Sequence, residues 1–332
     1  MVAATGLVVL CAIAGSAWAL LVLALFVGRG RARIEGRRAA ATLPAETEWR
    51  MPDDALDRVR LATVGDDDET REILLRALRS NEPELRLASV TTLGRLGDRY
   101  EWAIDGLVEA LVEEVDNPVR VAGQLDRLAP RCGLRLPPLL EHPSSVVRFY
   151  AVRLLGRYQE LATRHVPRMT DDSSANVRAA AVETLTAVAS GEALRCALRL
   201  LDDPHPGVRA QACRTAATIA PVTAAPFIVP LLGDRSWSVR EAGREALVAA
   251  GRDVSDSVVR GLHEEDTTVR AGAALVLQDI GVVDTLVDDA DTGQLERILD
   301  AGGRRLREAA TDRRRRGLNL GAPVAQSVEA LS

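Results

Sequence analysis

The hydrophobic and polar positions divide the chain into two parts with different periods. No charged side chain occurs between Val2 and Gly28, and the densest apolar run is Leu7–Val27. Farther along, apolar residues recur every three or four positions, as in Val177, Ala181 and Leu185. This spacing places them on one face of an amphipathic helix. The pattern predicts one long apolar helix followed by many shorter helices, each with one buried face.

The uncharged N-terminal stretch, residues 2–28, is long enough to span a membrane. As a helix it would be about 40 Å long, against about 30 Å for the hydrocarbon core of a bilayer. Ala17-Trp18-Ala19 resembles a signal-peptide cleavage site. A cleaved signal, however, has a basic region before its apolar core, and its core is shorter. We therefore predict a retained transmembrane anchor.

The basic residues next to this stretch set the expected orientation. They all follow the apolar segment, at Arg29, Arg31, Arg33, Arg37 and Arg38. Because loops rich in arginine remain on the cytoplasmic side, we predict a single-pass protein of the cell membrane with its N-terminus outside. Residues 29–52 are then a basic juxtamembrane segment and linker, and everything after them is cytoplasmic.

A repeated motif organises the rest of the chain. A Leu-Arg or Val-Arg dipeptide followed by alanine occurs seven times, with a period of about 31 residues and with its arginine at Arg86, Arg120, Arg148, Arg178, Arg209, Arg240 and Arg270. Asp, Asn, Ser or Pro precedes most of the motifs, as at a helix start, and a second, shorter apolar helix follows in most units. Gly94, Gly156, Gly191 and Gly281 are interpreted as helix ends. A fixed period of this length predicts an all-α solenoid.

The solenoid is expected over residues 53–290, with a degenerate first unit at 53–80. Residues 291–316 are predicted to form a C-terminal helix and basic run, which is either a solvated end or a contact with anionic lipid. Residues 317–332 are predicted to be a flexible tail. Only 3% of the residues are aromatic while 47% are hydrophobic, a composition that suits closely packed helices.

The charge distribution argues against nucleic-acid binding. Every one of the 42 basic residues is arginine, which a GC-rich genome explains. Residues 39–303 carry a net charge of −13, whereas residues 29–38 and 304–332 carry +4 each. Phosphate binding needs a positive field over the docking face. We therefore expect no nucleic-acid partner.

The motif Asp-x-(x)-Pro-x-Val-Arg-x-x-Ala resembles HEAT repeats, specifically the short type first noted in phycobilisome lyases. The resemblance covers residues 82–290. It implies that each repeated arginine, with the acidic residue of a turn, ties neighbouring repeats together; the alternative is a phosphate-binding row. Two units depart from the pattern: the unit after Arg120 has a weak second helix broken by Pro137-Pro138, and the last unit lacks the proline.

Residues with catalytic potential are few. The cysteines, at positions 11, 132, 196 and 213, include no C-x-x-C pair and are interpreted as reduced and structural. Histidines occur only at positions 142, 165, 205 and 263. Some HEAT-repeat proteins are di-iron hydroxylases built from several His-Glu pairs, and the single pair His263-Glu264 cannot supply such a site. We predict no catalytic residue, no metal, no cofactor and no small-molecule substrate.

The predicted function is a membrane-tethered cytoplasmic scaffold or adaptor that binds a protein partner. Long arrays of repeats offer extended surfaces to such partners. Arg195 and Arg199, one helical turn apart, are the candidate partner surface. The architecture suggests a membrane enzyme of envelope or polysaccharide synthesis as the partner. The alternative is a membrane-associated enzyme of the HEAT-like lyase type, although a membrane anchor is unlike those lyases and a fold does not fix a function.

Overall fold

The structure, a computed structural model, describes residues 54–61, 68–129, 131–283, 286–287 and 304–320. Within those ranges every regular element is helical and no strand occurs. The prediction of an all-α fold is confirmed for this part of the chain. The predicted anchor, the five juxtamembrane arginines and residues 321–332 of the predicted tail lie outside the described residues. Residues 317–320 of that tail instead continue the C-terminal helix.

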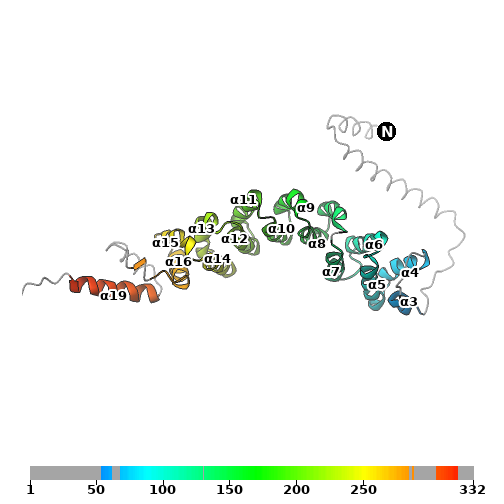
Figure 1. Cartoon of the computed structure of the whole chain (residues 1–332), viewed down its shortest axis with the longest axis horizontal. Helices are drawn as coiled ribbons and strands as arrows, with labels where there is room; N and C mark the ends of the chain where they lie inside the picture. The colour runs from blue at the N-terminus through cyan, green and yellow to red at the C-terminus, as the bar shows by residue number, and fades with distance from the viewer. Residues whose placement is uncertain (1–53, 62–67, 130, 284–285, 288–303, 321–332) are drawn as a thin grey trace, which may run out of the picture. The chain divides into compact units, whose positions relative to one another are not determined.

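Helices alternate between two layers, which Figure 1 shows as two rows in chain order. The first helices of the repeats form one layer: α3 (Ala55–Leu61), α5 (Pro83–Leu96), α7 (Pro118–Arg127), α8 (Ser145–Leu155), α10 (Ala175–Val188), α12 (Pro206–Ile219), α14 (Trp237–Ala250) and α16 (Thr267–Asp279). In the better-formed repeats each first helix packs on the next, as α10 does on α12 and α12 on α14.

The second layer consists of shorter segments that combine α and 3-10 turns. They are α4 (Asp68–Leu78), α6 (Glu101–Val112), η1 (Gly133–Arg135) with η2 (Pro137–Glu141), α9 (Gln159–His165) with η3 (Pro167–Asp171), α11 (Gly191–Arg199) with η4 (Leu200–Asp202), α13 (Pro221–Ile228) with η5 (Val229–Gly233), and η6 (Gly251–Val254) with α15 (Ser255–Gly261). Proline explains several of the breaks, because it lacks an N–H and clashes with the preceding turn. Pro230, for example, is the second residue of η5, the 3-10 helix that continues the chain directly after α13.

The core is built from small aliphatic side chains of the first helices. Val147, Val177, Val208 and Val239 are each fully buried, which confirms the predicted apolar face. Alanines beside them let neighbouring helices approach closely. In α7 the face is rotated, since Val119 is exposed and Val121 is buried in its place. The valine of the Val-Arg motif is therefore buried in the other repeats named above but exposed in α7.

The degenerate first unit is a packed pair of helices. Both α3 and α4 contact α5. Two buried hydroxyls of α5 bind the backbone of that pair: Oγ of Ser89 donates to the carbonyl of Leu74 at 2.6 Å, and Oγ1 of Thr92 donates to that of Val59 at 2.8 Å. Each bond satisfies a polar group that burial would otherwise penalise.

Helix α19 (Arg304–Leu320) follows the array and contacts α16. Its Leu306 and Ala310 are fully buried and belong to the same core cluster as the last repeats. The other side of α19 exposes Arg307, Arg314 and Arg315. The helix therefore covers apolar surface at this end of the array.

Four glycines were predicted to end helices, and two of these predictions are wrong. Gly156 caps α8 and Gly281 follows α16 with a left-handed φ of 71°, as predicted. Gly94 instead lies inside α5, where a Cβ would meet the side chain of Gln124, and Gly191 begins α11. At Gly94 the small residue permits the close approach of α7, and it does not end a helix.

Candidate functional site

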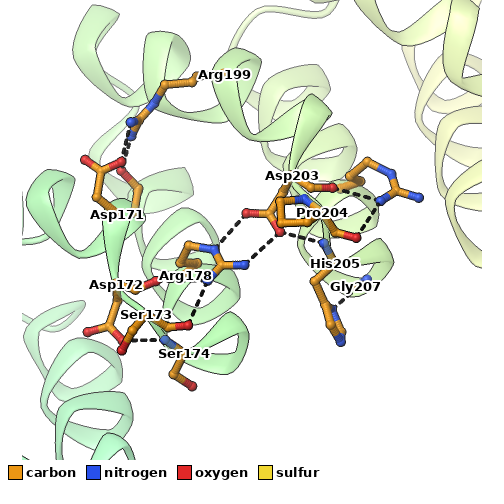
Figure 2. A network of polar contacts seen from close by, with 12 residues as sticks. Asp171, Asp172, Ser173, Ser174, Arg178, Arg199, Asp203, Pro204, His205 and Gly207 are labelled. Atoms are coloured by element: carbon orange, nitrogen blue, oxygen red, sulfur yellow. Dashed lines mark hydrogen bonds and ion pairs between the residues drawn. The ribbon is translucent and has the colours of Figure 1, made fainter.

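Three of the repeated arginines join their own repeat to the next one. Nε of Arg178 donates to Oδ2 of Asp203 at 2.7 Å and its Nη2 donates to Oδ1 at 2.9 Å (Figure 2). Arg148 makes the same paired contact with Asp172, and Arg209 makes it with Asp234. Two parallel hydrogen bonds to one carboxylate combine charge with fixed geometry. We call these three pairs the arginine ladder.

Each ladder arginine also closes the turn that precedes its own helix. Nη1 of Arg178 donates to the carbonyls of Asp172 and Ser173, at 2.9 and 3.2 Å. Arg148 and Arg209 bind the corresponding carbonyls of their turns. Since these guanidinium groups are already hydrogen-bonded and their side chains are largely buried, the contacts favour a role between repeats over a phosphate-binding row.

The aspartates of the ladder have a second role as turn caps. Oδ1 of Asp203 accepts from the backbone N–H of His205 at 2.8 Å, and Asp172 and Asp234 do the same two residues along. Burial by itself raises the pKa of these carboxyls. The hydrogen bonds from the arginine and the backbone outweigh burial, so the pKa of each lies below its ordinary value.

The ladder covers only the middle repeats. A repeated arginine belongs to it where the residue six positions before the repeated arginine of the following repeat is an aspartate. That position holds Asp172, Asp203 and Asp234, but His142 before Arg148 and Glu264 before Arg270. Arg86, Arg240 and Arg270 bind the carbonyls of their own turns. Arg120, on the rotated helix α7, binds Asp116 of its own turn at 2.8 Å. The sequence contained this signal in the spacing of aspartate to arginine.

The two arginines proposed as a partner surface differ in their surroundings. Arg199 is bound to Asp171 (Figure 2), and its Nη2 donates to Oγ1 of Thr170 at 2.7 Å. Arg195 is exposed and makes no polar contact within the described residues. Arg199 therefore also links α11 to the preceding repeat, whereas Arg195 is available to a ligand.

The histidines lie in turns or at helix ends. Nδ1 of His142 accepts from the backbone N–H of Ser144, and Nδ1 of His205 accepts from that of Gly207, each at 3.2 Å. His165 ends α9, and His263 follows α15. Burial, together with neighbouring arginines, lowers the pKa of His165. His142 and His205 act as local caps of the turns.

The described cysteines and acidic groups offer little reactivity. Cys132, Cys196 and Cys213 are unpaired. Burial raises the pKa of the Cys213 thiol to about 12 and also raises that of Cys132, so neither is a thiolate near neutral pH. Over the described ranges, no group of three His, Cys, Asp or Glu side chains is arranged to hold a metal ion. Over the same ranges, no helix is both long and apolar enough to cross a bilayer.

Comparison with known proteins supports the helical-repeat architecture. Residues 165–248 match the family model for HEAT repeats. The fold is similar to one chain of a structure describing Kap95p binding to RanGDP (TM-score 0.53, 14% identity, 73% of this chain and 38% of that one). Residues 165–248 are therefore similar to HEAT repeats, and the described part of the chain is an all-helical array that resembles an α-solenoid of such repeats.

Two further comparisons concern individual proteins. The Kap95:Nup1 complex gives a TM-score of 0.53 at 14% identity, over 77% of this chain and 41% of that one. The CpcE–CpcF phycocyanin lyase of a Nostoc species gives 0.31 at 18% identity, over 81% and 96%. The chain thus spans about two fifths of the length of the Kap95p chains. No curated protein sequence matches it.

Proposed function

We propose that the chain is a membrane-tethered scaffold whose second-helix layer binds a protein partner in the cytoplasm. The observation that carries this proposal is the set of exposed side chains that packing does not use. On that layer Leu134 is 84% exposed and Phe227 is 55% exposed. Leu134 and Phe227 are three repeats apart, so a partner that contacts both must extend along several repeats.

The similar structures support a role in protein interaction. In one of them Kap95p binds RanGDP, and another is a complex of Kap95 with Nup1. An array of helical repeats suits such contacts because each added repeat extends the surface by a constant step. We infer that this chain also acts by binding protein, through the repeats whose exposed side chains complement the surface of the partner.

The tether is expected to place the array beside other membrane proteins. Holding two molecules on one membrane raises their effective concentration without any new contact. We propose that the partner is itself a membrane enzyme, of envelope or polysaccharide synthesis. Purification of the full chain from detergent-solubilised membranes, followed by identification of co-purifying proteins, tests that proposal.

The anchor and its orientation give a direct prediction. A phosphatase that requires export should be inactive when fused after Ser332, and a cytoplasmic reporter fused there should be active, because the arginines after residue 28 hold that side in the cytoplasm. Deleting residues 1–28 should move the chain from the membrane to the soluble fraction. The reverse reporter pattern, or a mature N-terminus near Leu20, would contradict a retained anchor.

The enzyme alternative is tested through the histidines. Replacing His142, His165, His205 and His263 together with alanine should leave the cellular phenotype of the protein unchanged. Replacing either of the two capping histidines, His142 or His205, should lower the free energy of unfolding by about 1 kcal/mol at most. Circular dichroism checks that the variant is folded. Loss of the phenotype in a folded variant would instead support the membrane-associated enzyme.

A further inference from the structure

The second segments of six consecutive repeats present equivalent side chains in one row. The row consists of six exposed residues: Asp105, Leu134, Arg164, Arg195, Pro226 and Asp256. The residues two before and two after each of them are buried, so the side chain between them points away from the core. It therefore forms a line across the second layer, perpendicular to the helices.

The chemistry of this row is symmetric about its middle. Two cationic residues lie at the centre, one apolar residue lies on each side, and an acid lies at each end. The four central positions, Leu134 to Pro226, are spaced 30 or 31 residues apart. Phe227, next to Pro226, adds a large exposed ring at one apolar end.

A second row four residues later repeats the same order at its centre. Its exposed members are Glu109, Pro138, Arg168, Arg199, Pro230 and Arg260. Residues about one turn apart lie on the same side of a segment. The two rows together give a central basic patch on α9, η3 and α11, with apolar borders on η1–η2 and α13–η5. We call this surface the basic–apolar strip.

The strip has cationic groups free to meet a ligand. Arg164 and Arg195 are exposed and have no ion pair among the described residues. Arg168 and Arg199 are paired with Glu141 and with Asp171, but about half of each side chain remains exposed. Besides burial, Arg168 and Arg164 depress the pKa of His165, as a locally positive field would. The basic patch therefore lies within residues 39–303, a part of the chain whose net charge is −13.

We propose that the basic–apolar strip binds an extended segment of the partner that carries two carboxylates flanked by large apolar side chains. The proposal rests on the scaffold function and names the chemistry of its partner. Neighbouring helices of a layer lie about 10 Å apart. A polyproline II chain presents every third residue on one face at about 9 Å intervals. Such a chain, laid along the strip, places apolar, acidic, acidic and apolar side chains opposite Leu134, Arg164, Arg195 and Phe227.

The test uses the full chain in detergent micelles and a fluorescent peptide, Leu-Pro-Pro-Glu-Pro-Pro-Glu-Pro-Pro-Phe, with its glutamates replaced by lysine in a control peptide. Fluorescence anisotropy should show saturable binding of the acidic peptide only, weakening as salt rises. Arg164→Glu with Arg195→Glu should weaken binding by about tenfold or more, because both contacts become repulsive. Leu134→Ser with Phe227→Ser should weaken it by about fivefold with no change in salt dependence.

A matched variant separates local from general charge effects. Arg99→Glu with Arg235→Glu makes the same charge change at two exposed arginines outside the strip, and it should alter binding less than about twofold. All of these positions are exposed, so each variant is expected to fold. Absence of saturable binding, equal binding of the lysine peptide, or equal loss in the control variant would each overturn the proposal.

Recovery of a natural partner distinguishes this proposal from the scaffold function. If a membrane protein co-purifies with the wild type and also with Arg164→Glu/Arg195→Glu, the scaffold stands and the strip is not its docking site. If the charge-reversed variant loses the partner while Arg99→Glu/Arg235→Glu retains it, both proposals are supported. Failure of the wild type to recover any partner, with peptide binding intact, would count against the scaffold alone.

Discussion

Replacing Val208 with aspartate should unfold the middle of the array. Val208 is fully buried, in the same cluster as Val239 and Ala212. A carboxylate there has no partner, and burying it should cost about 4 kcal/mol or more. Urea unfolding followed by circular dichroism measures the loss, and hydrogen exchange shows whether α12 and its neighbours open first, as expected of an array held by contacts between adjacent repeats.

The chain offers the same substitution at an exposed site as a control. Val222 is 56% exposed and lies in the first turn of α13. Val222→Asp places a carboxylate near a helix N-terminus, where it is tolerated, and should change stability by less than about 0.5 kcal/mol. Similar losses in Val208→Asp and Val222→Asp would contradict the assignment of Val208 to the core.

Breaking one step of the arginine ladder should be almost as damaging. In Arg178→Ala, the carboxylate of Asp203, whose side chain is only 3% exposed, loses its cationic partner. Removing one member of a buried pair leaves an uncompensated charge, and the expected cost is about 3 kcal/mol. Arg153→Ala is the matched control, because the Arg153–Glu183 pair is half-exposed on both sides and should contribute less than about 1 kcal/mol.

The same pair predicts a dependence on pH. The pKa of Asp203 is lowered in the fold, so its contribution to stability is present above the ordinary carboxyl pKa, about 4, and is lost as pH falls through the lowered value. The difference in unfolding free energy between the wild type and Arg178→Ala should therefore be largest near neutral pH and narrow in acid. A difference that stays constant from pH 7 to pH 3 would show that Asp203 is not the group responsible.

The sequence alone identified the repeat and the buried face of most first helices. Val177 and Val208 were predictable because helical spacing ties each buried position to the next within one element. Val119 was not, since the rotation of α7 depends on how α5 and the irregular segment after α7 pack against it. Pro137-Pro138 signalled one weak second segment, but the division of the other second segments into α and 3-10 turns was not predicted, because it depends on the packing of the whole layer.

The candidate site was harder to predict because it joins different repeats. The arginine motif was visible, yet whether an arginine enters the ladder depends on the residue six positions before the next arginine, as the contrast between Asp172 and His142 illustrates. Likewise Arg195 and Arg199 looked equivalent on one helix. Only the neighbouring turn, which brings Asp171 to Arg199, separates a residue held between repeats from one that is free.

The double role of the ladder aspartates has a consequence for changes in the length of the array. Asp203 caps the turn of its own repeat and also accepts from Arg178 of the repeat before it. Excising residues 172–202 would place Asp203 where Asp172 now accepts from Arg148, so that every remaining residue of the ladder keeps a partner. A cut that is not a whole number of periods would separate the two roles. The middle of this chain can therefore lose or duplicate whole periods with the arginine ladder intact.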